Sequence, residues 1–411
     1  MARKMKDSGI EWIGEIPEGW EVVQLKRFAE VHNGREIDVE VDSTDSSAVG
    51  VYGSGGVFKY TNRAQYSGKA VLFGRKGTLG KPLYVEGQLW AVDTMYFLTY
   101  SNRLLEKFSY YQFLAFNWAP YITHTAIPSV VASEIVACYF PIPPLEEQAK
   151  IADYLDNGCA SLDTILDKTR SSIEEYKKLK QAVITQAVTK GVRGEREMKD
   201  SGNPWFGQIP ADWKLTRVGL HFSIILGKML CNAPLNDTYT LEPYYCAADV
   251  HFDGVADGER KKMWFSPIEK NLYRVSVGDL LVVEGGAGAG GSAIVENQDS
   301  GTYIQNSIMI VRSKGNADNR YLRYLLEFLV KQGYIDIVCN KATIPHFTKD
   351  KLSCVPFCLC PTGEQKEIAD YLDAKCAEID KLIAKKEQLV KELESYKKSL
   401  IYEVVTGKRE V

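Results

Sequence analysis

The sequence lacks several features that would place it in a class at once. No apolar run approaches the length of a membrane-spanning helix, so we expect no contact with a membrane. The basic stretch Met1 to Asp7 leads into no apolar segment, so we expect no export signal. The nine cysteines are odd in number and irregular in spacing, which predicts free thiols in a reducing compartment. These absences favour a cytoplasmic protein.

Motifs of catalysis are also missing. The sequence has no Walker-type phosphate loop, no Asn-Pro-Pro-aromatic run of the methyltransferase kind and no carboxylate cluster typical of nucleases. The loop Gly286–Gly291 satisfies the dinucleotide-binding pattern, but the residues after it, Ser292 to Glu296, are typical of a strand and not of a phosphate-binding helix. We therefore expect no enzymatic activity in the isolated chain.

Charge has to be considered locally, because the net charge of the 411 residues is only −3. Between Asp45 and Glu86 there is no acidic residue, although six cations are present: Lys59, Arg63, Lys69, Arg75, Lys76 and Lys81. An ordinary solvated basic face would explain this stretch. However, the aromatic residues Tyr52, Phe58, Tyr60, Tyr66 and Phe73 lie between the cations, which favours a surface that contacts phosphates.

The chain contains an internal repeat with two matched blocks. Residues 5–9 (MKDSG) recur at 198–202, and the matches continue to Trp20 and Trp213 at a constant offset of 193. A second block runs without a gap from Ile127-Pro128 to Val188-Thr189, at an offset of 217. The segments between the blocks, about 21–125 and 214–342, share little. A constant frame around two divergent middles indicates one scaffold that presents two different binding surfaces, whereas duplication without functional meaning would not explain the divergence.

The ends of both copies are typical of long helices. Apolar residues recur every three or four positions from Leu145 to Val183 and from Ile368 to Leu400, which is the pattern of a coiled coil. About 44 residues at 1.5 Å each predict a rod of roughly 65 Å. If the copies are related by a pseudo-two-fold axis, the helices pair antiparallel. A pure coiled-coil scaffold would leave the divergent middles unexplained.

These residues resemble the specificity subunits of type I restriction-modification systems. The opening phrase from Met5 to Trp20 looks like the N-terminal signature of that family, and Pro143–Ala152 looks like the start of its conserved helical region. Ala187–Thr189 and Val404–Lys408 resemble the ends of such regions. The second copy departs from the pattern, with Cys360–Gly363 in place of the Pro-Pro-Leu-Glu run.

The resemblance implies an α+β fold with two globular target-recognition domains separated by two long antiparallel helices. The expected division is a first recognition domain at 1–144, a first spacer helix at 145–192, a second recognition domain at 193–361 and a second spacer helix at 362–411. It further implies double-stranded DNA and two modification (methyltransferase) subunits as partners, together with restriction subunits that act as translocase and nuclease. S-adenosylmethionine, ATP and Mg would be used by these partners, with no cofactor or metal bound by this chain.

Candidate contacts follow for both domains. Glycine lets the backbone approach DNA closely, arginine can bind guanine edges, and lysine can bind phosphate. In the first domain we expect DNA contacts from Tyr52, Ser54, Lys59, Arg63, Arg75, Lys76, Thr78 and Lys81. In the second, the Gly286 loop aligns with the Arg75 loop but lacks cations, so the candidates are Lys228, Arg260, Lys261, Lys262, Trp264, Ser292, Lys341 and His346. Ordinary hairpin loops with basic tips are the alternative.

Two further expectations concern the frame. His346 with Cys354, Cys358 and Cys360 could suggest zinc, but the spacing matches no common zinc pair, so we expect no metal site. The beginnings of the helices are expected to bind partner subunits through Glu147, Gln148, Tyr154, Glu364, Gln365 and Tyr371. The rival hypothesis is a non-catalytic adaptor on a coiled-coil scaffold, whose variable domains bind proteins.

Overall fold

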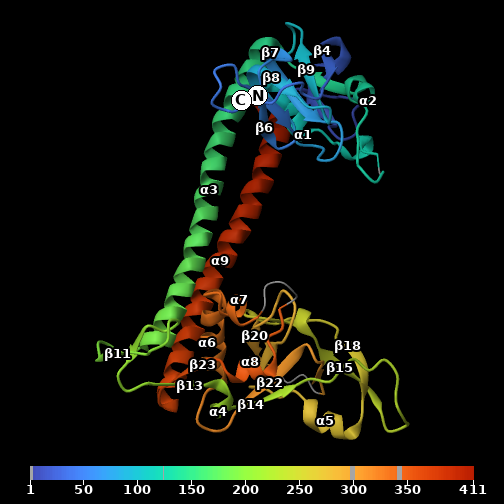
Figure 1. Ribbon diagram of the computed structural model, residues 1–411. Helices are drawn as coiled ribbons and strands as arrows, with labels where there is room; N and C mark the ends of the chain where they lie inside the picture. Colours follow the sequence, from blue (N-terminus) through green and yellow to red (C-terminus); the bar gives the residue numbers. More distant parts are fainter. Residues whose placement is uncertain (1–2, 124, 297–300, 340–344) are drawn as a thin grey trace. The chain divides into compact units, whose positions relative to one another are not determined.

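The computed structural model describes residues 3–123, 125–296, 301–339 and 345–411. The chain divides into two compact units, one formed by residues 1–171 and 386–411 and the other by residues 172–385. Both boundaries fall inside the long helices α3 (Leu145–Lys190) and α9 (Thr362–Val405) (Figure 1). Each unit therefore contains a globular part and a portion of both helices. The division into two recognition domains and two spacer helices that we expect from the sequence stays a prediction.

The two long helices confirm the helical pattern in the sequence. They are 46 and 44 residues long, and each is followed by a glycine with positive φ, Gly191 (78°) and Gly407 (71°). This left-handed conformation costs glycine little and ends a helix. No helix in the described ranges has both the length and the apolar character that a bilayer crossing requires.

Within each unit the helix portions run antiparallel, as predicted. In the first unit Asp163 pairs with Lys397 and Arg170 with Glu394, at 2.6 Å each. The residue number therefore increases along α3 while that of its partner on α9 decreases. In the second unit Lys180 pairs with Asp380 at 2.6 Å.

The predicted apolar stripe is only partly correct. Ile151, Leu155 and Leu162 are buried, but Ile165 and Leu179 on α3 are 46% and 48% exposed. On α9, Leu389 and Tyr396 are 41% and 48% exposed. These four residues lie outside the seam, because a straight helix drifts relative to a fixed spacing of three and four.

The first unit is built around a six-stranded sheet with the order β4-β9-β7-β8-β5-β6, accompanied by the two-stranded sheets β1-β2 and β3-β10. Its strands are β1 (Met5–Asp7), β2 (Glu15–Pro17), β3 (Glu21–Gln24), β4 (Ala29–Asn33), β5 (Val49–Gly53), β6 (Gly56–Thr61), β7 (Tyr66–Gly74), β8 (Leu83–Ala91), β9 (Met95–Tyr100) and β10 (Tyr139–Ile142). Its shorter helices are η1 (Leu25–Arg27), α1 (Glu106–Ala115), η2 (Ala119–Tyr121) and α2 (Ala132–Ala137).

The second unit contains a four-stranded sheet, β14-β22-β19-β20, a three-stranded sheet, β18-β15-β21, and the pairs β11-β12, β13-β23 and β16-β17. Its strands are β11 (Met198–Asp200), β12 (Gln208–Pro210), β13 (Lys214–Arg217), β14 (Phe222–Leu226), β15 (Thr240–Tyr245), β16 (Val250–His251), β17 (Gly254–Val255), β18 (Lys261–Phe265), β19 (Leu280–Val283), β20 (Ser292–Ile294), β21 (Tyr303–Ile304), β22 (Ile308–Ser313) and β23 (Pro356–Leu359). Its shorter helices are α4 (Val218–His221), η3 (Ala247–Asp249), α5 (Pro267–Tyr273), α6 (Asn319–Lys331), α7 (Tyr334–Val338) and α8 (Lys349–Ser353).

The sheets of the two units have matching connections. In both, a central strand (β7 or β19) pairs antiparallel with the strands that follow it, and a parallel pair (β5-β8 or β15-β21) joins the rest. The second unit is longer because β16 and β17 lie between β15 and β18, where the first unit has a tight turn, and because α5 precedes β19. The divergent middles therefore share one fold.

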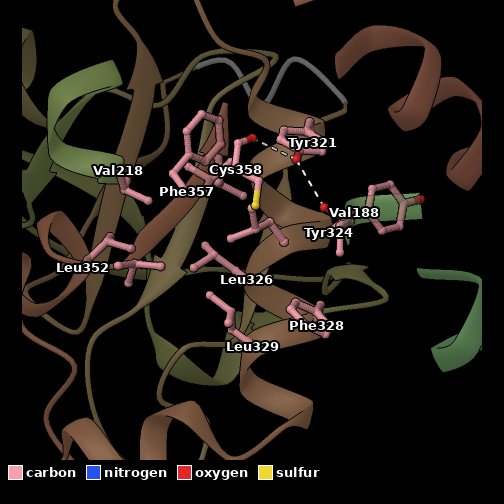
Figure 2. Packing of buried hydrophobic residues seen from close by; sticks show 14 of the residues in the cluster. Val188, Val218, Tyr321, Tyr324, Leu326, Phe328, Leu329, Leu352, Phe357 and Cys358 are labelled. Carbon is pink, nitrogen blue, oxygen red and sulfur yellow. Dashed lines mark hydrogen bonds between the residues drawn. The ribbon is translucent and has the colours of Figure 1, made fainter. Parts of the chain in front are cut away.

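Each unit has its own core, in which the long helices take part. In the second unit Tyr321 of α6 is fully buried, and its hydroxyl donates to the carbonyl oxygen of Cys358 (2.9 Å) and lies 3.5 Å from that of Val188 on α3 (Figure 2). Burial strongly raises the pKa of this phenol, so it is neutral. Tyr321 thus ties α6, β23 and the end of α3 together.

Candidate nucleic-acid interface

A three-residue connector, Val92–Thr94, organises one end of the first globular part. It joins β8 to β9. The N–H of Val92 donates to the carbonyl oxygen of Tyr52 at 3.2 Å, while the N–H groups of Arg75 and Lys76 donate to that of Thr94 at 2.8 and 3.3 Å. The connector therefore brings together the two loops that the sequence predicted as DNA contacts. The connector follows directly on β8, which ends at Ala91.

A second segment that sequence reasoning missed completes this loop cluster. The N–H of Gly77 donates to the carbonyl oxygen of Pro128 at 2.9 Å, and Val130 donates to that of Arg75 at 3.1 Å. Ser129 and Lys76 form an isolated antiparallel β-bridge between these two hydrogen bonds. The internal repeat could have pointed to this segment, because Ile127-Pro128 is the start of its second matched block.

The second unit repeats most of the hydrogen bonds of this backbone arrangement. The N–H of Gln305 donates to Tyr245 (3.1 Å), and that of Glu284 donates to Ser307 (2.8 Å). Gly286 donates to Pro345 at 3.1 Å, as Gly77 does to Pro128. The predicted alignment of the Gly286 loop with the Arg75 loop is confirmed. The loop leads into strand β20, as predicted, and not into a phosphate-binding helix.

One glycine in each unit makes this arrangement possible. A Cβ atom on Gly34 would lie 1.7 Å from the carbonyl oxygen of Val92, and one on Gly227 would lie 2.4 Å from that of Gln305. No side chain fits at such distances. The residues that follow, Arg35 and Lys228, donate their N–H groups to Ala91 (2.8 Å) and Ile304 (3.1 Å). The strand β4 is thereby held against the connector Val92–Thr94, and β14 against the second connector, Gln305–Ser307, which joins β21 to β22.

Most of the predicted contacts of the first domain lie at the surface. Lys76, Thr78 and Lys81 are exposed, while Tyr52 and Ser54 are half-buried. Arg75 is half-buried, with its guanidinium carbon 5.7 Å from the ring centre of Tyr96. Burial raises the pKa of the Tyr52 phenol, which therefore stays a hydrogen-bond donor.

Two other predicted cations of this domain are paired with carboxylates. Lys59 lies 2.7 Å from Glu40, and Arg63 lies 3.8 Å from Asp38. All four side chains are more than 40% exposed, so these pairs are weak and exchangeable. Phe73, one of the aromatic residues taken as a sign of a phosphate-contacting surface, is wholly buried and belongs to the core, whereas Phe58 is 57% exposed.

In the second domain two predicted cations point into the protein. Lys228 is 10% exposed and lies 2.5 Å from Glu269. Burial opposes ionisation of Glu269, but hydrogen bonds from Lys228 and Ser266 outweigh it and lower the pKa of the carboxyl. Arg260 is 12% exposed, 3.4 Å from Asp249 and stacked over Tyr245. Both cations stabilise the fold around β15.

The remaining candidates of this domain differ in position. Lys261 and Lys262 are exposed at the start of β18, and Trp264 is half-buried. His346 is 62% exposed, with Nδ1 3.5 Å from the carboxylate of Glu284. Ser292 is fully buried beneath the loop, so its predicted DNA contact is wrong. Lys341 lies outside the described residues.

Register relates two of these lysines across the repeat. Lys59 on β6 is opposite Val51 on β5, and Lys261 on β18 is opposite Tyr244 on β15. Val51 and Tyr244 are 193 residues apart, the offset of the repeat in this part of the chain. The two units therefore carry a lysine at the same point of the same edge strand.

The residues predicted to bind partner subunits prove to be of two kinds. Gln148 and Gln365 are fully buried. Gln148 accepts a hydrogen bond from the N–H of Leu105 (2.8 Å) and donates to the carbonyl oxygens of Pro143 (2.9 Å) and Arg103 (3.1 Å). Gln365 is held in the same way by Asp318 and Cys360. Direct partner contacts by these glutamines are excluded, because their polar atoms bind the chain itself.

The neighbouring glutamates also act within the chain. Glu147 lies 2.6 Å from Arg3 and accepts a hydrogen bond from the indole of Trp20 at 3.1 Å. Glu364 is fully buried against Arg196, so the prediction that it contacts a partner is wrong. Tyr154 and Tyr371, 38% and 40% exposed, do lie on the helix surface. Tyr371 borders a hollow of ≈ 540 Å³ with Lys190 and Arg193.

Comparison with known proteins agrees with this architecture. The family described as type I restriction modification DNA specificity domain matches residues 17–175 and 237–392, which together are more than half of the chain. The chain therefore belongs to the family of type I restriction-modification specificity subunits, with its domain present twice.

Individual relatives match over nearly the whole length. The specificity subunit of the type I restriction enzyme MjaX from Methanocaldococcus jannaschii is 26% identical, over 96% of this chain and 95% of the relative. That of MjaVIII from the same organism is 26% identical, over 96% and 93%. A solved structure of the HsdS subunit from Thermoanaerobacter tengcongensis matches 96% of this chain and 98% of its own, at 18% identity and a TM-score of 0.51, which supports the fold.

Proposed function

We propose that this specificity subunit reads the two halves of a bipartite, asymmetric DNA target with its two globular parts. The observation that carries the proposal is the shared backbone network with different side chains on it. Arg75 in the first unit corresponds to Glu284 in the second, and Asp93 of the first connector corresponds to Asn306 of the other. One geometry that presents different donors and acceptors suits two different half-sites.

The chemistry of these positions fits base recognition. A guanidinium at Arg75 can donate two hydrogen bonds to O6 and N7 of guanine, whereas a carboxylate at Glu284 accepts from the amino group of cytosine. An amide at Asn306 can bind adenine through N6 and N7. Lys59 and Lys261 occupy equivalent points beside these loops, where a cation binds phosphate without regard to sequence. Lys76, Lys81 and Lys262 add exposed positive charge.

The long helices are proposed to set the length of the unread spacer and to bind two modification subunits. Tyr154 and Tyr371 are the exposed residues of the predicted set, and tyrosine is enriched in protein interfaces. The two buried glutamines, the buried Glu364 and the half-buried Glu147 hold each helix to its globular part, which gives a partner a rigid surface. A helix that resists bending is also what a spacer requires.

We further propose that the chemistry of the complex belongs to the partners. The modification subunits would use S-adenosylmethionine, and the translocase-nuclease subunits ATP and Mg, while this chain contributes binding. Within the described residues no group of three or more His, Cys, Asp or Glu side chains could hold a metal ion. The chain would work beside its partners in the cytoplasm.

Exchange of one recognition surface tests the proposal. Residues 21–125 are replaced by the corresponding segment of a relative, and methylated sites are mapped in cells that express the complex. One half-site should change while the other stays. Changes in both halves would show that the two domains read DNA jointly. If the purified complex preferred no duplex over another in competition binding, the protein-binding adaptor would be the better account.

A further inference from the structure

The ion pairs between the long helices fall into two kinds when they are compared through the repeat. Asp163 pairs with Lys397 at 2.6 Å in the first unit, and Lys180 with Asp380 at 2.6 Å in the second. Because Asp163 corresponds to Asp380 and Lys180 to Lys397 at the offset of 217, these are two copies of one pair. Each helix carries both the aspartate and the lysine of this pair. The pair would therefore form equally well between two copies of the same helix.

The pair Arg170–Glu394 is different. The guanidinium lies 2.6 Å from the carboxylate, with both side chains about half exposed. The repeat counterpart of Glu394 on α3 is Lys177, whose ammonium pairs with Glu174 of its own helix at 2.9 Å. The counterpart of Arg170 on α9 is Glu387. α3 therefore carries cations at both positions of this pair, and α9 carries anions at both.

The consequence appears when like helices are paired in the same register. Two copies of α3 would place Arg170 opposite Lys177 of the other copy, and two copies of α9 would place Glu394 opposite Glu387. Both arrangements juxtapose like charges, whereas α3 with α9 forms an attractive pair. Flanking charges of this kind determine partner choice in coiled coils, and repulsion in the wrong pair is as important as attraction in the right one.

We propose that Arg170, Lys177, Glu387 and Glu394 form a charge code that makes α3 select α9 and reject a second copy of itself. The code protects the asymmetry of the molecule, because a like pair would combine two identical globular parts. It concerns assembly of the chain and does not depend on which ligand the globular parts bind.

A variant with reversed preference tests the code. Lys177→Glu with Glu394→Lys places a lysine opposite Arg170 and makes both like pairs attractive. Lys178→Glu with Glu392→Lys is the matched control, because it makes the same change in composition at exposed neighbouring positions. Neither double variant alters the net charge.

The readout is the choice of partner after the connection between the halves is cut. A protease site is inserted after Gly194, which has open space around it, and the folded protein is cleaved there. The cleaved protein is unfolded in urea and refolded at low salt, and native mass spectrometry counts mixed and like pairs. Wild type and control should give mainly mixed pairs, and the ratio of mixed to like pairs should fall about tenfold in the reversed variant. Random pairing of wild type, or a reversed variant that behaves like the control, would overturn the proposal.

The intact chain gives a second measurement that does not depend on refolding of cleaved halves. At low salt the urea midpoint of the reversed variant should lie below that of the control. The difference should vanish near about 1 M NaCl, where the screening length is only about 3 Å. Equal midpoints at low salt would show that Arg170 and Glu394 do not contribute to pairing, and the code would be rejected.

Discussion

Arg75 and Glu284 occupy the same backbone position in the two units, although their charges are opposite. Each N–H donates over 2.8 Å to the connector of its unit, at Thr94 and Ser307 respectively. Each carbonyl oxygen accepts from the residue that follows the Pro-Ser or Pro-His step, Val130 or Phe347. The difference between the two sites at this point is therefore one of side-chain chemistry and not of fold.

We expect Arg75→Ala to weaken binding of the complex mainly at one base pair of the first half-site, by about 1–3 kcal/mol. The guanidinium is the group on this loop that can bind a guanine edge with two hydrogen bonds. Binding to duplexes altered one base pair at a time measures the effect.

Lys76→Ala is the companion to that change. Its ammonium is exposed beside Arg75, so its loss should weaken all duplexes alike and lower the slope of affinity against salt. If Arg75→Ala left both affinity and base preference unchanged, the loop would not be the reader.

Gly34→Ala should abolish preference in the first half-site and leave the second intact. Its Cβ would lie 1.7 Å from the carbonyl oxygen of Val92, so the connector would have to move. We expect a loss of about 1–3 kcal/mol in the free energy of unfolding of the first unit. Gly55→Ala is the control, because nothing lies within 4 Å of its Cβ position. Methylation mapping and urea unfolding would contradict the prediction if the two variants behaved alike.

Gln148→Ala should destabilise the first unit without a change in DNA preference. The substitution leaves the buried N–H of Leu105 and the carbonyl oxygen of Pro143 without their partner, which costs about 1–3 kcal/mol for each unmade bond. Glu146→Ala, at an exposed position on the same helical turn, should have little effect. Urea unfolding compares the two, and equal midpoints would mean that the glutamine does not hold the helix in place.

Adding four residues to both helices, near Lys168 and Lys385, should lengthen the unread spacer by one to two base pairs. Four residues add about 6 Å of helix, close to two base-pair steps. The positions are repeat counterparts, so the two stripes keep facing each other. The half-sites themselves should be unchanged in methylation mapping. An unchanged spacer in an active variant would mean that the helices only hold the partner subunits.

Periodicity and repetition in the sequence were sufficient to predict the long helices, because a helix is specified by local spacing. The doubled order of motifs likewise predicted two copies of one fold. Strand pairing was harder to predict, since the parallel contact between β5 and β8 joins residues nearly forty positions apart.

The site shows the same division between local and distant information. Arg75, Lys76 and Lys81 could be named as candidates because cations and glycines cluster in one loop. Pro128 and Ser129 were missed because they reach that loop only through tertiary hydrogen bonds. Ser292 and Gln148 were misassigned because a polar side chain gives no sign of its burial in a single sequence. The partners of Gln148 are main-chain carbonyl and N–H groups, which carry no mark in the sequence.

The connectors have one more consequence, for how such a surface can change over time. Their contacts with the loops of Arg75 and Glu284 run from main chain to main chain, although the hydroxyl of Ser307 also accepts a hydrogen bond from the N–H of Ala247 at 3.1 Å. Under the proposed function, a new residue at Arg75, Asp93 or Asn306 would change the groups offered to DNA at little cost in folding. Gly34 and Gly227 are different, because a Cβ atom at either position would lie 2.4 Å or less from a carbonyl oxygen of the connector. New specificities can therefore arise by single steps on a support that stays the same.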